Sequence, residues 1–195
     1  MKVNFVKTFI PVKDFVAVEK VGNKMLVRFD AVKDADMDAY SCVEGSVSAS
    51  EYNEQEVRRE YEAWKQKWAE KALVLAKKAK IAEITAYDTS GKVNGFMLNG
   101  LLVWLDKATR VGLMNSTTIA KAAGQQTTTL WLGGLKLVVD CDKAIQLLSA
   151  LEMYALECFN VTASHKQAVS ELTSIEDVEV YDYKKVYPKM LEMSV

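Results

Sequence analysis

The chain has 195 residues, of which 50% are hydrophobic and 26% are charged. This balance is typical of a protein with a buried core and argues against global disorder. The 25 Lys and Arg residues against 26 Asp and Glu residues give a formal net charge of −1. Such a chain has no excess of one charge to attract nucleic acid or an anionic membrane, so we expect neither as a partner.

The cysteine pattern and the apolar runs indicate a soluble protein made in a reducing compartment. Cys42, Cys141 and Cys158 are odd in number and form no close pair in the sequence. They favour reduced, buried thiols over a disulfide framework. The first residues lack the apolar region of a secretory signal. No stretch approaches the roughly 18 apolar residues of a membrane-spanning helix.

We expect residues 1–49 to form a β-rich segment. Gly22-Asn23 lies between two runs of β-branched residues and predicts a hairpin. Residues 30–38 are polar and acidic and are expected to form a loop, followed by a further strand over 40–47. These short strands cannot bury much surface alone, so we expect them to pack on the next part of the chain.

We predict one long amphipathic helix over residues 50–88. Ser48 and Glu51 have the spacing of a capping box, and no Gly or Pro occurs after them until Gly91. Apolar residues recur at spacings of three and four: Val57, Tyr61, Trp64, Trp68, Ala72, Leu75, Ala79, Ala82 and Ala86. A helix of ~35 residues is ~50 Å long, more than a small domain needs. We therefore expect Tyr61, Trp64 and Trp68 to mediate self-association or another interface.

Residues 89–195 are predicted to form a compact domain of antiparallel hairpins packed on helices. The turns Asn99-Gly100 and Gly133-Gly134 each separate two apolar runs and predict hairpins. Asp106 is the expected cap of a helix over 107–123 that ends at Gly124. Asp140 or Asp142 is the expected cap of a second helix, which continues through Leu172. A short helix after Thr173 and an aromatic tail over 180–191, packed back on the domain, complete the segment. Together these elements predict the fold class α+β.

Few residues carry chemistry. His165 is the single histidine and lies on an apolar helical stripe, so we interpret it as a core residue. Asp34, Asp36 and Asp38 alternate like the first ligands of a calcium loop. Ala39 and Gly45, however, stand where the loop needs glycine and glutamate. We predict no catalytic, cofactor-binding or metal-binding residues, and no cofactor.

The aromatic residues of the last hundred positions are divided between core and surface. Trp104 and Trp131 lie in alternating strand patterns and are expected in the core. The tail residues Tyr181, Tyr183 and Tyr187 are expected at the surface and are the better interface candidates.

Several motifs resemble an uncharacterised family of C-terminal domains. The matching stretches are Val93-Asn94-Gly95-Phe96, Leu98-Asn99-Gly100, the run from Trp104 to Arg110, Thr129-Leu130-Trp131, Leu148 to Ala155, Tyr181-Asp182-Tyr183 and Tyr187-Pro188. The resemblance covers about residues 80–195. The family occurs in tail modules of bacteriophages and prophages, particularly of gut anaerobes, often beside tail-fibre genes. It supplies no catalytic residues. The motif that contains Asp106 and Arg110 can be explained by structure alone: we expect Asp106 to cap the helix and Arg110 to pair back to it.

The resemblance implies a role at the phage tail, for which there are three hypotheses. We expect a non-enzymatic structural protein of the virion tail that docks on tail-fibre or baseplate components. The second hypothesis is a tail-fibre assembly chaperone that stays in the host cytoplasm, and the third is a module that binds receptor glycans. A conserved, buried carboxylate pair in a pocket would instead favour an enzyme.

Overall fold

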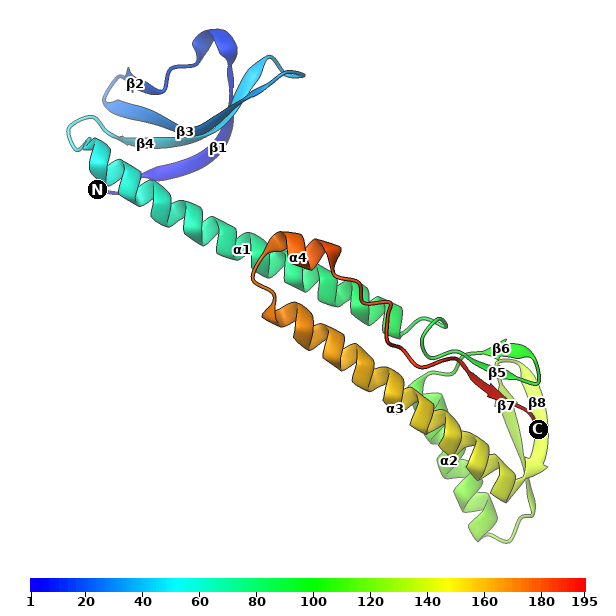
Figure 1. Cartoon of the computed structure of the whole chain (residues 1–195). Helices are drawn as coiled ribbons and strands as arrows, with labels where there is room; N and C mark the ends of the chain where they lie inside the picture. The colour runs from blue at the N-terminus through cyan, green and yellow to red at the C-terminus, as the bar shows by residue number, and fades with distance from the viewer. The chain divides into compact units, whose positions relative to one another are not determined.

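The computed structural model describes residues 1–195 and has the predicted α+β fold. It forms two compact units, Met1–Ala72 and Leu73–Val195. One helix, α1 (Glu54–Asp88), contributes its first part to the first unit and its last part to the second (Figure 1). No helix combines the length and apolar character that crossing a membrane requires.

The first unit contains a four-stranded antiparallel sheet in the order β1-β4-β3-β2. Its elements are β1 (Asn4–Pro11), a 3₁₀ turn (Val12–Asp14), β2 (Val18–Val21), β3 (Lys24–Asp34) and β4 (Ala39–Ser48). The predicted hairpin at Gly22-Asn23 is confirmed: Val21 pairs with Lys24, and Gly22 has a φ of +59°. The left-handed conformation explains the glycine.

The prediction of a loop over residues 30–38 is wrong for its first half. Strand β3 continues to Asp34, and a register shift lies between Phe29 and Val32. Asp30, inside this irregularity, has a φ of +47°. A bulge lets a polar residue interrupt the alternation without ending the strand, which is why composition alone indicated a loop.

Helix α1 starts later than the capping box predicted. Asn53 is the residue before the helix, and its side-chain oxygen accepts the amide of Glu56 at 3.1 Å. Ser48 and Glu51 instead lie in a turn, where the amide of Glu51 donates to the carbonyl of Ser48. Asparagine serves as a helix cap as well as serine does, so Asn53 takes the role that was expected of Ser48.

The apolar stripe of α1 changes face along the helix, which the sequence-based stripe missed. Its first part buries Val57 and Tyr61, as predicted. In the last part Ile84 is fully buried, and Leu73, Ala76 and Ile81 pack around it. The predicted members Leu75, Ala79, Ala82 and Ala86 are exposed.

The second unit contains two small sheets and three further helices. A three-stranded sheet has the order β6-β5-β9, and β7 pairs with β8 in a hairpin. The elements are β5 (Phe96–Leu98), β6 (Leu101–Val103), α2 (Lys107–Ala122), β7 (Thr127–Leu132), β8 (Leu135–Asp140), α3 (Cys141–Glu171), α4 (Ile175–Val180) and β9 (Leu191–Met193). Both predicted hairpins are confirmed, with positive φ at Asn99, Gly100, Gly133 and Gly134. Strand β9 pairs with β5 in parallel, a pairing that the predicted antiparallel hairpins did not include.

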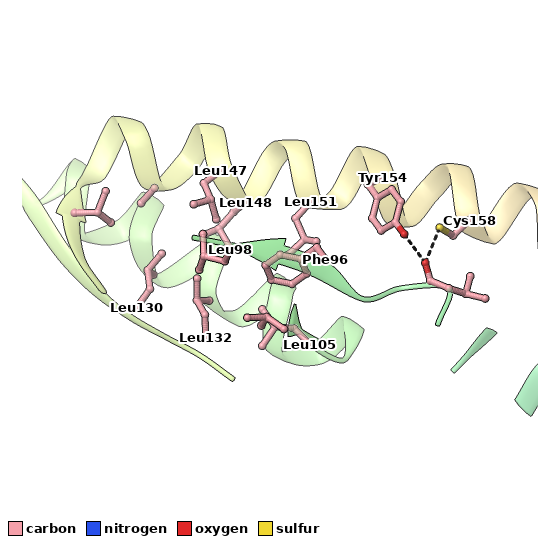
Figure 2. Close-up of a cluster of buried hydrophobic side chains, with 14 residues drawn as sticks. Phe96, Leu98, Leu105, Leu130, Leu132, Leu147, Leu148, Leu151, Tyr154 and Cys158 are labelled. Atoms are coloured by element: carbon pink, nitrogen blue, oxygen red, sulfur yellow. Dashed lines mark hydrogen bonds between the residues drawn. The ribbon is translucent and has the colours of Figure 1, made fainter. Parts of the chain in front are cut away.

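The core of the second unit lies between helix α3 and the short strands. Leu148 and Leu151 of α3 face Phe96 and Leu98 of β5, while Leu130 and Leu132 of β7 enter from the other side (Figure 2). The same view shows the hydroxyl of Tyr154 and the thiol of Cys158 converging on one backbone oxygen, the carbonyl of Val93. Burial of these side chains fixes the hairpins against the helix.

Candidate functional site

A cavity of about 420 Å³ opens on the second unit between α2 and α3. Its apolar wall is formed by Trp104 and Leu105, which precede α2, and by Ala155, Leu156 and Phe159 of α3. The polar residues that line it are Asp88, Thr89, Asn94, Asp106, Lys107, Arg110 and Glu152. The volume falls within the range of roughly 300–1,000 Å³ that small-molecule sites have.

Asp106 lines the cavity and caps the start of α2. Its carboxylate accepts the amide of Thr109 at 2.8 Å and the hydroxyl of the same residue at 2.7 Å, which confirms the predicted cap. These hydrogen bonds hold the pKa of the Asp106 carboxyl below its usual value, and the one from the Thr109 hydroxyl has the largest effect. A carboxylate at a helix N-terminus is also favoured by the helix dipole.

Arg110 does not pair back to Asp106, contrary to the prediction. Its Nε donates to Oε1 of Glu152 on α3 at 2.8 Å, and its Nη1 donates to the carbonyl of Leu105 at 2.8 Å. Arg110 is only 8% exposed. The guanidinium therefore ties α2, α3 and the preceding loop together in the lining of the cavity, which a pair with Asp106 four residues away could not do.

The polar side of the cavity is anchored at the end of α1. Asp88 accepts the hydroxyl of Thr162 at 2.8 Å, and Thr162 also shares a hydrogen bond of 2.9 Å with the hydroxyl of Tyr187. The side-chain amide of Asn94 donates to the backbone carbonyl of Asp88 at 2.5 Å. These contacts fix Asp88 and Asn94 at the cavity edge.

The core placement predicted for Trp104 and Trp131 is wrong. Trp104 is 42% exposed and Trp131 is 60% exposed. Trp104 lies just beyond β6, in the cavity wall. Trp131 pairs with Lys136 on the outward face of the β7–β8 hairpin, because Leu130 and Leu132 take the inward positions. The alternating pattern showed which residues share a face of the strand, but it did not show which of the two faces packs against the core.

The tail tyrosines, predicted at the surface, are partly buried within the second unit. Tyr183 and Tyr187 pack edge-on against Tyr87, with ring centroids 5.6 and 5.7 Å apart. The hydroxyl of Tyr181 shares a hydrogen bond of 2.9 Å with Nδ1 of His165. Burial raises the pKa of both Tyr181 and Tyr187. These side chains attach the tail to the unit, which leaves them little surface for a partner.

The aromatic interface candidates of α1, Tyr61, Trp64 and Trp68, lie in the first unit, and none of them lines the cavity. Tyr61 is 3% exposed: its ring stacks on Phe29 at 4.1 Å between centroids, and its hydroxyl donates to Asp30 at 2.6 Å. Trp64 is partly buried and stacks on Trp68, which is 47% exposed. Of the three predicted interface residues on α1, Tyr61 is thus internal, Trp64 is partly buried and Trp68 is exposed.

The interpretation of the thiols and of the single histidine as core residues is confirmed. His165 is 8% exposed and bonds through Nε2 with the carbonyl of Lys185 at 3.0 Å. Cys42, Cys141 and Cys158 are free and buried. In the acidic turn, the side chain of Asp34 accepts the amides of Asp36 and Met37, which gives this residue a role in the turn itself.

Sequence reasoning missed most of the cavity residues. Glu152, Leu156 and Phe159 were passed over because the core stripe of α3 accounted for the helix. A signal was present: Met153, Leu156 and Phe159 recur at a spacing of three and are 50–61% exposed. A helix with a second apolar stripe outside its core face offers a surface for binding.

Comparison with known proteins identifies one family. Residues 75–185 match the family described as "Domain of unknown function (DUF4376)". No curated protein and no solved structure matches the chain.

Proposed function

The chain belongs to the DUF4376 family, and we propose that it is a non-enzymatic structural protein of a phage tail that docks on a tail-fibre or baseplate component. The motifs shared with domains of phage tail modules support the location. The surface of the first unit supports the mode of action. Because docking needs an uncovered apolar surface, the argument depends on where such a surface lies.

That surface runs along strand β1 and is formed by Lys7, Phe9 and Trp68; we call it the β1 surface. Phe9 is 57% exposed, and it lies on the same side of the strand as Lys7. The Nζ of Lys7 lies 5.3 Å from the ring centroid of Trp68. Two exposed aromatic side chains, one of them with a cation over its ring, resemble the composition of binding hot spots.

The strand beneath this surface is open on one side. Strand β1 is eight residues long and pairs only with β4, at the edge of the sheet. Its outer backbone groups are free to pair with a strand of another chain. The open edge beside exposed aromatic residues is the single observation that carries the docking proposal.

Mass spectrometry of purified phage particles tests the proposal. We expect peptides of the chain in particles produced by the host that encodes it, at a ratio to fibre or baseplate proteins that further purification does not change. Absence from particles would overturn the structural role. Presence in the lysate together with the fibre, but not in particles, would identify an assembly chaperone instead.

Variants of the β1 surface test whether this surface is what attaches the chain to the phage particle. In a phage complemented with the altered gene, Trp68→Ala and Phe9→Ala should each lower incorporation into particles. Val32→Ala is the matched control, since Val32 is 64% exposed in the same sheet but lies outside the β1 surface. Light scattering of the purified 21.8 kDa chain tests whether a second copy of the chain, and not a tail component, occupies the β1 surface. A dimer that dissociates in Trp68→Ala would identify the second copy as the partner.

A further inference from the structure

The cavity of the second unit has apolar and aromatic side chains in its wall that the rest of the fold does not cover. Trp104, Leu156 and Phe159 are 42%, 50% and 61% exposed. They come from two separate segments, the loop before α2 and the middle of α3, and they line one cavity. Apolar side chains that gather at a cavity without joining the core mark a ligand site.

Arg110 adds a free donor to this cavity. Its Nε and Nη1 are bonded to Glu152 and to the carbonyl of Leu105, whereas its Nη2 has no protein partner. Across the chain, the one buried side-chain nitrogen or oxygen without a partner is Thr117 Oγ1, so Nη2 must reach solvent. Since Arg110 is 8% exposed and lines the cavity, that solvent is the cavity.

Other polar atoms of the lining are also unused. Oδ2 of Asp88, the side-chain oxygen of Asn94 and Oε2 of Glu152 accept no hydrogen bond, although the opposite atom of each group is bonded. The ammonium of Lys107 has no ion-pair partner. Donors and acceptors are therefore both available, and most are held in place by a second bond to the protein.

The charge of the lining is nearly balanced, with the three carboxylates of Asp88, Asp106 and Glu152 against the two cations of Lys107 and Arg110. Neither a phosphate nor a polycation gains from such a balance. A neutral ligand with many hydroxyl groups does gain, because each hydroxyl both donates and accepts. The aliphatic face of a sugar ring also packs well on an aromatic face.

We propose that this cavity binds a neutral saccharide, with a sugar ring on Trp104 and its hydroxyl groups bonded to Arg110, Asp88 and Glu152. The site would give the chain a carbohydrate-binding activity in addition to docking. It lies in the second unit, whereas the β1 surface lies in the first, so the two proposals stand or fall separately.

Binding of the full chain to an array of neutral oligosaccharides is the first test, and titration of the best ligand in the millimolar range is the second. In a ¹⁵N-correlated spectrum of the wild-type chain, the indole signal of Trp104 should shift with saccharide. The indole signal of Trp131 should not, because this residue is exposed on the same unit but outside the cavity.

Two variants of the cavity and one control variant complete the test. Trp104→Ala should weaken binding by at least tenfold and Lys107→Met by a smaller factor, while Trp131→Ala should leave it unchanged. An array without any bound saccharide would overturn the proposal. It would also be overturned if Trp104→Ala bound as tightly as the wild type, or if the Trp131 signal shifted in place of that of Trp104.

Discussion

Replacing Arg110 by Met should destabilise the second unit, and the structure permits an estimate of the amount. Methionine keeps an apolar stem but removes both hydrogen bonds of the guanidinium. The carbonyl of Leu105, a residue only 6% exposed, loses its donor, at a cost of about 1 kcal/mol. The pair with Glu152 lies between a surface and a buried one, since the two side chains are 10% and 34% exposed. We assign it about 1–2 kcal/mol, so the total loss is about 2–3 kcal/mol.

A double-mutant cycle identifies the partner of Arg110. Arg110→Met combined with Glu152→Ala should show a coupling free energy of about 1–2 kcal/mol, because the two side chains are bonded at 2.8 Å. Arg110→Met combined with Asp106→Asn should be additive, because Asp106 is bonded to Thr109 instead.

Unfolding in urea, monitored by circular dichroism, gives the free energies for the cycle. Hydrogen exchange of the α2 and α3 amides assigns the loss to the second unit, since the two units need not unfold together. Coupling to Asp106 with additivity at Glu152 would refute the structural assignment and restore the pairing expected from the sequence.

Two further predictions concern the core of the second unit and the acid stability of the first. Leu148→Ala should cost about 3–4 kcal/mol in urea unfolding and Met153→Ala less than about 0.5 kcal/mol, because Leu148 is 1% and Met153 is 60% exposed; equal losses would contradict the core assignment. Hydrogen bonds from Tyr61 and then Lys65 lower the pKa of Asp30. The stability they confer is complete above the unfolded-state pKa of about 4 and is lost as the pH falls through the lower folded-state value. Tyr61→Phe should therefore make the acid side of a plot of urea midpoint against pH shallower, and an unchanged profile would contradict this role of Asp30.

The sequence predicted well those features that depend on a few adjacent residues. The hairpin at Asn99-Gly100 and the cap at Asp106 were predicted because turn and cap chemistry needs particular side chains at particular backbone angles. The order of such signals also indicated the α+β class. In each case the hydrogen bonds that form the turn or cap join residues within about four positions of each other, so the local sequence is enough to predict them.

The predictions that failed depend on residues far apart in the chain. The partner of Arg110 is 42 residues away, and the parallel partner of β5 is the last strand of the chain. Exposure of Trp131 depends on which face of β7 the core of the second unit covers. The cavity could not be predicted because its lining comes from the end of α1, the start of α2 and the middle of α3. Only the second stripe of α3, at Leu156 and Phe159, left a local trace.

Helix α1 shows why its length was a poor argument for self-association. The apolar stripe of its first part is buried at Tyr61 and continues through the partly buried Trp64 to Trp68, which is exposed. The stripe of its last part resumes at Leu73. A step of five residues from Trp68 is about 500° of rotation, roughly 140° beyond a full turn, so the second stripe lies on another face. The step coincides with the boundary between the units at Ala72. Alanines continued the apparent stripe across it, because their small size suits either face. Since each part of the helix packs on its own unit, no partner is needed to explain about ten turns of helix. Evidence for a partner therefore comes from the side chains that both units leave uncovered, Trp68 on the one and Trp104 on the other.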